Sequence, residues 1–254
     1  MVFDVFMLIL KDLFKVLDGT RVKIANFASQ HSNALLNKNS ETAIRVKSGL
    51  IFGFIFILSL LLGGLIFDVL MLLFAVIIFD EWKNMIKSTE GVQHKYWYFG
   101  GIVYTVLPIA SLINIRHFIY GGSILFWYFA VIWATDCGAY FIGRKVGGRK
   151  LAPAISPGKT VSGASGGILC AFIVGILFTL TVRNTKFGDL GVIGLGIVAC
   201  IIAILAQSSD LLESYLKRRF NIKDTGNIMP GHGGLMDRMD SITLSAPFLL
   251  LLLS

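Results

Sequence analysis

Acidic residues are concentrated in one polar segment between the last two apolar runs of the chain. Residues 208–240 contain Asp210, Glu213, Asp237 and Asp240. Asp237 and Asp240 are three positions apart, as are Asp210 and Glu213, so each pair would share one face of a helix. Carboxylates that converge on one site repel each other, and a divalent cation removes that repulsion. Such hard oxygen ligands favour Mg²⁺, which also binds phosphate.

The same segment carries a glycine-rich loop, and cations surround it. Residues 230–234 read Pro-Gly-His-Gly-Gly, and such glycines let backbone N–H groups approach phosphate oxygens. Taken singly, each residue has an ordinary explanation, such as a helix cap for an aspartate or a headgroup anchor for the Lys217-Arg218-Arg219 run. Together they favour a site for a phosphate group, with Lys217, Lys223, Asp224, His232 and Arg238 as further candidates.

A second polar segment, residues 136–164, supplies more groups of the same kind. It begins with Asp136 directly after an apolar run and contains Arg144, Ser156, Lys159 and Thr160. Cations offset the charge of a polyphosphate, and hydroxyl groups orient its oxygens. The spacing is not that of a Walker A loop. The alternative is a basic loop that only sets membrane topology.

Long apolar runs must position these two segments. The runs cover residues 48–63, 65–80, 97–113, 119–135, 165–182, 189–207 and 241–254. Several approach the roughly 20 residues that cross a bilayer, and a backbone in hydrocarbon must satisfy its own hydrogen bonds, so each should be helical. We therefore predict an all-α, polytopic membrane protein of about seven transmembrane helices with cytoplasmic catalytic loops.

The basic residues predict the orientation of these spans. With a cytoplasmic N-terminus, Lys and Arg number 7 in residues 1–47, 3 in 81–95, 5 in 136–164 and 5 in 208–240, which leaves 3 of the 23 for the opposite side. Positive residues concentrate on the cytoplasmic side of membrane proteins. Both polar segments should therefore face the cytoplasm, and we expect a multi-pass protein of the inner membrane.

Composition agrees with a membrane protein and argues against other classes. Only 15% of residues are charged and the mean hydropathy is +0.75, against about 25% charged residues in soluble domains. The net charge of +8 suits anionic headgroups and a polyphosphate, and no segment has the pattern of a nucleic-acid binder. We expect two parts: a polar or amphipathic leader (1–47) without an assigned function, and a transmembrane catalytic domain (48–254).

Residues 214–240, SYLKRRFNIKDTGNIMPGHGGLMDRMD, resemble the signature of the phosphatidate cytidylyltransferase (CDP-diacylglycerol synthase) family. That pattern runs Ser, Lys-Arg, Lys-Asp, a Pro/Gly-x-His-Gly-Gly loop and Asp-Arg-x-Asp. The upstream DCGAYFIGRKVGGRKLAPAISPGKT resembles the family's cytoplasmic loop, and the resemblance covers about residues 45–254. It implies transfer of CMP from CTP to phosphatidate, which gives CDP-diacylglycerol and pyrophosphate in phospholipid biosynthesis.

The resemblance also implies roles for particular residues. Asp210 and Asp237 match metal ligands for Mg²⁺, with a second cation, for which K⁺ is the candidate, near the same carboxylates. Asp224 and Asp240 match further functional acids, and with Lys223 and His232 they form the predicted catalytic set. The predicted substrate-binding residues are Asp136, Arg144, Ser156, Lys159, Thr160, Lys217 and Arg238. The expected partners are CTP, phosphatidate and membrane lipids.

Other interpretations of the same residues stay open. Carboxylates near membrane depth also mark ion paths in transporters and channels, although the acids here cluster at helix ends beside a glycine-rich loop. A CTP-dependent polyprenol kinase or an archaeal-type lipid cytidylyltransferase would use similar groups. A membrane scaffold would leave the acidic cluster unexplained. The small residues within 188–200 could support a homodimer, but lipid contact explains them as well.

Overall fold

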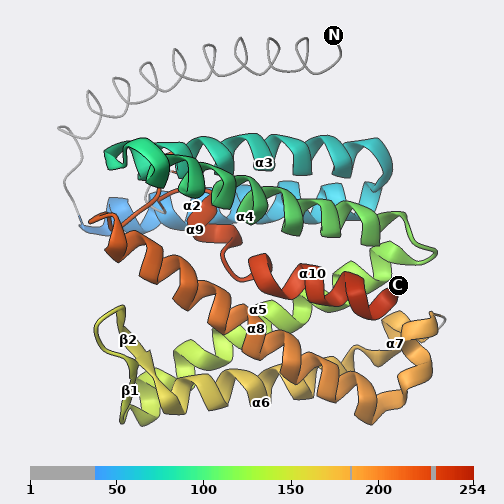
Figure 1. The fold of residues 1–254 in the computed structure, drawn as a ribbon. Coiled ribbons are helices and arrows are strands. Elements are labelled where there is room, and N and C mark those ends of the chain that lie inside the picture. The colour runs from blue at the N-terminus through green and yellow to red at the C-terminus, as the bar shows by residue number, and fades with distance from the viewer. Residues whose placement is uncertain (1–37, 184, 230–232) are drawn as a thin grey trace, which may run out of the picture.

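The computed structural model describes residues 38–183, 185–229 and 233–254, and these are mainly helical (Figure 1). The first long helices are α2 (Lys38–Leu62), α3 (Gly64–Met85), α4 (Gly91–His117) and α5 (Gly121–Val146), with the short 3₁₀ helix η1 (Ile86–Ser88) after α3. There follow β1 (Lys150–Ala152), β2 (Ser156–Thr160), α6 (Val161–Leu177), α7 (Thr179–Val182), the 3₁₀ helix η2 (Lys186–Leu190) and α8 (Gly191–Arg219). The chain ends with α9 (Met236–Met239) and α10 (Ile242–Leu253).

The predicted apolar runs all fall on helices, although 165–182 is divided between α6 and α7. By length and composition, three segments of the described chain can cross a membrane: Gly91–His117, Gly121–Val146 and Phe187–Arg219. Val46–Leu62, Val161–Leu177 and Ile242–Leu253 are apolar but shorter. These helices support the predicted membrane protein, whereas the count of seven spans and the side that the loops face stay predictions.

Helices α5 and α6 pack against each other extensively, and glycines lie in this contact. A Cβ atom added to Gly167 would lie 2.8 Å from the Thr135 carbonyl oxygen, and one on Gly163 would lie 2.7 Å from that of Ala139. Small residues at such positions let two helical backbones approach closely in a membrane protein. The packing therefore fixes the C-terminal half of α5, which carries Asp136, against the start of α6.

The short helix α10 lies inside the bundle, between α4 and α8 (Figure 1). Ser245 on α10 shares a hydrogen bond of 2.7 Å with the hydroxyl group of Tyr128, which is fully buried on α5. The neighbouring Trp127 donates its indole N–H to the Gly175 carbonyl oxygen on α6 at 2.9 Å. Buried Tyr and Trp side chains need such partners for their polar atoms. These bonds tie α5, α6 and α10 into one core.

The basic segment after α5 forms a small antiparallel hairpin, which the prediction of an all-α protein missed. Strands β1 and β2 pair in the register Lys150↔Thr160 and Ala152↔Ser156. Gly147 and Gly148 turn the chain out of α5 with φ of +66° and +96°, a region that glycine adopts without strain. Thr160 then caps α6, because its hydroxyl oxygen accepts the Gly163 N–H at 3.1 Å.

The predicted boundary between leader and catalytic domain is only partly represented in the structure. Helix α2 begins at Lys38, whereas the first apolar run begins at 48. The polar end of the leader therefore continues into the first helix. Residues 1–37 lie outside the described part of the chain, so the prediction for them stays untested.

Candidate functional site

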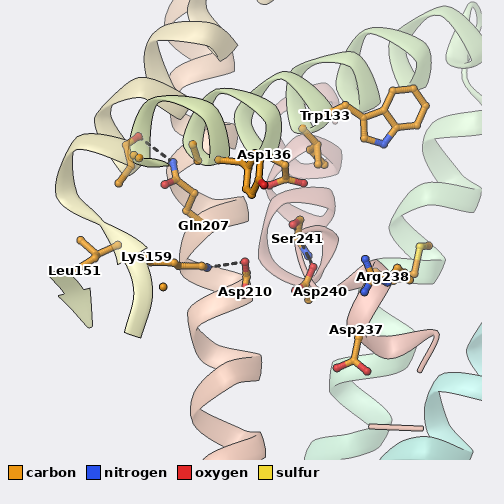
Figure 2. A pocket seen from close by; sticks show the side chains of 18 of the residues that line it. Trp133, Asp136, Leu151, Lys159, Gln207, Asp210, Asp237, Arg238, Asp240 and Ser241 are labelled. Atoms are coloured by element: carbon orange, nitrogen blue, oxygen red, sulfur yellow. Dashed lines mark hydrogen bonds and ion pairs between the residues drawn. The ribbon is translucent and has the colours of Figure 1, made fainter. Parts of the chain in front are cut away.

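A cavity of about 1220 Å³ lies where α2, α5, the hairpin, α6, α8 and the start of α10 meet (Figure 2). Its lining changes in character from one part to another. The acidic lining residues come from separate parts of the chain and are Asp136, Asp210, Asp237 and Asp240. The basic ones include Arg144, Lys150, Lys159 and Arg238. The apolar ones from α2 and α5 include Phe52, Phe56, Phe129, Ile132 and Trp133. The cavity thus joins a charged region to an apolar wall.

Three of the carboxylates act on one another across this cavity. Figure 2 shows Asp136, Asp210 and Asp240 around the same space, on α5, on α8 and just before α10. Lys159 on β2 forms an ion pair with Asp210, with 2.5 Å between Nζ and Oδ2. Lys159 thus pairs with one of the three carboxylates, and the mutual repulsion among the three would be relieved by a further cation.

Asp240 shows the effect of this crowding most clearly. Its Oδ1 accepts the Ser241 N–H at 2.7 Å, and its own carbonyl oxygen accepts the Ser209 hydroxyl at 2.5 Å. Burial, followed by the charges of Asp210 and Asp136, raises the pKa of Asp240 to about 7. Near neutral pH this carboxyl group is therefore partly protonated, and perturbed pKa values of this kind are common at functional sites.

Asp237 has a different environment, because protein donors surround its carboxylate. Oδ2 accepts the N–H groups of Gly234 at 2.8 Å and Thr225 at 3.0 Å, and also the Thr225 hydroxyl at 3.1 Å. Oδ1 pairs with Lys217 Nζ at 2.7 Å. Burial acts to raise the pKa of Asp237, but the hydrogen bonds from Lys217, Gly234 and Thr225 outweigh it and hold that pKa below its ordinary value. Asp237 therefore stays ionised and binds the backbone at Thr225 and Gly234.

Lys217 links this loop to the interior of the bundle. Besides Asp237, it contacts Glu213 on α8 at 3.1 Å, and Glu213 accepts the Tyr104 hydroxyl of α4 at 3.0 Å. Glu213 has no exposed surface. Asp210 and Glu213 were expected to share a helix face, yet Asp210 lines the cavity and Glu213 is buried against Tyr104 and Lys217.

The structure brings many of the predicted site residues together. Those that line the cavity are Asp136, Arg144, Lys159, Thr160, Asp210, Asp237, Arg238 and Asp240. Ser156 lies on β2 outside the lining, and Lys217 lies behind Asp237. Lys223 and Asp224 are exposed beyond the end of α8 and do not line the cavity. His232 falls outside the described residues. No functional role follows from placement alone, so these roles stay predictions.

The acidic groups fit a hard cation that is shared with a substrate. Within the described ranges, no three His, Cys, Asp or Glu side chains come close enough to hold a metal ion by themselves. Mg²⁺ commonly takes only one or two carboxylates from the protein and completes its shell with water and phosphate oxygens. Asp136, Asp210 and Asp240 are the lining residues that could contribute such carboxylates.

Sequence comparison decides the family. Residues 96–254 match the sequence model of the Cytidylyltransferase family. The chain belongs to this family. It is 39% identical over 216 residues to a phosphatidate cytidylyltransferase of Rickettsia bellii, with 84% of this chain and 90% of that protein covered. A phosphatidate cytidylyltransferase of Bacillus subtilis is 38% identical over 183 residues, which cover 72% of this chain and 66% of that protein. The resemblance predicted from residues 214–240 is thereby confirmed.

The cytidylyltransferase match includes every lining aspartate but leaves α2 and α3 outside. Sequence reasoning missed one buried charge in this outer part, Glu81 on α3, which has no exposed surface. A signal for it was present, because a glutamate at the end of an apolar run is costly unless it has partners. The sequence around it, residues 81–95, predicts only the orientation of the spans, and no role is predicted for Glu81.

Proposed function

We propose that this cytidylyltransferase transfers CMP from CTP to phosphatidate, giving CDP-diacylglycerol and pyrophosphate. The observation that carries the proposal is the mixed lining of the cavity, with aspartates and cations in one part and aromatic side chains of α2 and α5 in another. Phosphatidate has a phosphate head and acyl chains, so it needs a site with both characters. The relatives named phosphatidate cytidylyltransferase support the same substrate pair.

The chemistry requires no activated Ser or Cys. The phosphate of the lipid is already anionic near neutral pH, so its oxygen can attack the α-phosphorus of CTP while pyrophosphate leaves in line. Catalysis then depends on positioning and on neutralising charge. Lys159, Arg144 and Arg238 line the cavity and are the cations that we assign to the phosphate groups. Thr160 offers a hydroxyl group beside Lys159.

We propose Mg²⁺ as the cofactor, with K⁺ as the candidate for a second cation. Asp210 is the best supported ligand, because Asp136 and Asp240 face it across the cavity. Asp237, the second predicted ligand, would have to exchange one of its present donors for the ion. An Mg²⁺ ion held by Asp210 would neutralise the negative charge that develops on the leaving pyrophosphate.

The proposed setting is the cytoplasmic face of the inner membrane. CTP comes from the aqueous side and phosphatidate from the bilayer, so the cavity has to communicate with both. Polar groups at membrane depth are tolerated where protein encloses them or where they line an aqueous cavity. The predicted excess of Lys and Arg on one side supports a cytoplasmic opening.

The decisive experiment incubates purified protein with radiolabelled CTP and phosphatidate, in the presence of either Mg²⁺ or EDTA. Mass spectrometry then gives the mass of the product. We expect a CDP-lipid and pyrophosphate with Mg²⁺ and no product with EDTA. A phosphorylated alcohol formed from a polyprenol would identify a lipid kinase instead. Ion flux in vesicles without any CTP-dependent product would identify a transporter.

A further inference from the structure

Glu81 holds the segment that follows the glycine-rich loop. Its Oε1 accepts the Leu235 N–H at 3.0 Å and its Oε2 accepts the Met236 N–H at 2.8 Å. Leu235 is the residue directly before α9, and Met236 is the first residue of that helix. N–H groups at the start of a helix have no partner within it and need an outside acceptor. The buried carboxylate of Glu81 supplies that acceptor from a different helix, α3.

A single hydroxyl group joins Glu81 to Asp237. The Thr225 hydroxyl lies 3.2 Å from Oε2 of Glu81 and 3.1 Å from Oδ2 of Asp237. Asp237 also accepts the Thr225 N–H, as described above. The two carboxylates therefore hold the chain at two places, before the glycine-rich loop and after it. Through Lys217, the same set of contacts continues to Glu213 on α8.

The backbone packs directly against the Glu81 side chain at two glycines. A Cβ atom added to Gly226 would lie 2.5 Å from Oε1 of Glu81, and one added to Gly234 would lie 2.6 Å from Oε2. The Glu81 carboxylate thus lies in close contact with the backbone at both Gly226 and Gly234. These bonds connect Glu81 to the lining of the cavity only indirectly, through Thr225 and α9.

We propose that Glu81 is a positioning residue that sets where α9 places Asp237 and the neighbouring Arg238 and Asp240 around the cavity. Two properties of the contact support this role. Both oxygens accept backbone N–H groups, so an amide in place of the carboxylate would turn an N–H₂ group toward an N–H donor. The acceptor also comes from α3, so it fixes the start of α9 against a helix that is remote in the sequence. The catalytic part of this proposal rests on the proposed function.

The test compares Glu81→Gln with Glu90→Gln, since Glu90 is an exposed glutamate at the start of α4. Hydrogen exchange of the full chain in lipid nanodiscs reports on the amides of residues 225–229 and 233–237. For Glu81→Gln we expect these amides to exchange faster by on the order of tenfold, with α6 and α8 protected as in the wild type. We also expect kcat to fall roughly 10- to 100-fold, and KM for CTP to change much less. Glu90→Gln should leave both readouts unchanged.

Thr225→Val provides a second route to the same answer if Glu81→Gln does not fold. It keeps the side-chain shape and removes the hydroxyl bridge between the two carboxylates, so exchange near residues 233–237 should rise by about fivefold. Wild-type exchange in either variant that folds would overturn the proposal. So would a loss of protection throughout α6 and α8, because that would mark a general structural role. If the wild-type enzyme formed no CDP-lipid, the proposed function would be contradicted instead. The hydrogen-exchange data would still decide the positioning role of Glu81.

Discussion

Lys159 on β2 and Asp210 on α8 form an ion pair, with 2.5 Å between Nζ and Oδ2. The pair joins the hairpin to the helix that carries the acidic cluster. A triphosphate in the cavity would compete with Asp210 for the ammonium group. Lys159 is therefore placed to change partner from a carboxylate to a phosphate when a nucleotide binds.

Removal of this cation should impair catalysis strongly. We expect Lys159→Ala to lower kcat/KM for CTP by on the order of 10²-fold, because a preorganised charge beside the phosphates is lost. Steady-state kinetics with varied CTP measure the effect. Lys145→Ala is the matched control, since Lys145 is exposed at the end of α5 and does not line the cavity. Equal losses in the two variants would mean that only overall charge matters.

Asp237→Asn should reduce both activity and stability. Turnover should fall by on the order of 10²-fold or more, because the loop and the charge beside the phosphates are both disturbed. The side chains of Asp237 and Lys217 are 7% and 17% exposed, and loss of one partner of a buried ion pair costs about 3 kcal/mol. Thermal unfolding in detergent and the CTP assay measure the two effects. Asp189→Asn, at an exposed position of η2, should match the wild type. Activity retained in Asp237→Asn would remove Asp237 from the site.

Asp240 should make the stability of the metal-free protein depend on pH. Its folded-state pKa of about 7 lies above the ordinary value of 3.8, so between these values the folded state holds a proton that the unfolded state has released. Its contribution to stability is therefore complete below about pH 4 and declines as pH rises to about 7. Asp240→Asn should flatten this part of the Tm profile measured in EDTA from pH 5 to 8. An identical slope in the variant would show that Asp240 is not the group that titrates.

The same proton should oppose metal binding. If Mg²⁺ requires the ionised cluster, the increase in Tm produced by Mg²⁺ should be larger at pH 8 than at pH 5.5. The comparison measures Tm at each pH in Ca²⁺-free buffers with and without Mg²⁺. A stabilisation independent of pH would indicate that the ion binds away from Asp240.

The α5–α6 contact should be intolerant of even one methyl group. Gly167→Ala places Cβ 2.8 Å from the Thr135 carbonyl oxygen, and such overpacking costs about 1–3 kcal/mol. Gly100→Ala on α4 is the control, because its Cβ would lie 3.8 Å from Trp82, an ordinary contact. Thermal unfolding should show a lower Tm for Gly167→Ala and an unchanged or higher Tm for Gly100→Ala. The reverse order would contradict this packing.

The sequence was sufficient to predict the helices and most of the acidic cluster, because apolar runs and motif spacings are local properties. Asp210, Asp237 and Asp240 lie within one short segment, and Asp136 directly follows an apolar run. The bond between Glu81 and Leu235 could not be predicted in this way, since 154 positions separate the two residues. Which aspartate faces the cavity and which holds a loop also depends on tertiary contacts, as Asp237 and Asp240 show.

The hairpin illustrates a different limit. Residues 150–160 contain two prolines and a glycine, which predict turns and argue against regular strands. The strands form nevertheless, because the segment only has to return the chain from the end of α5 to the start of α6. Lys159 is thereby carried to α8, a contact that composition alone did not indicate.

Because α5 and α6 meet backbone to backbone at Gly163 and Gly167, the two helices cannot slide past each other without a collision. We therefore expect α5 and α6 to move as one rigid unit, so that the side of the cavity that bears Asp136 and Thr160 keeps its shape. Any widening of the chamber to admit a lipid must then come from the facing side, where α2 contributes Phe52 and Phe56.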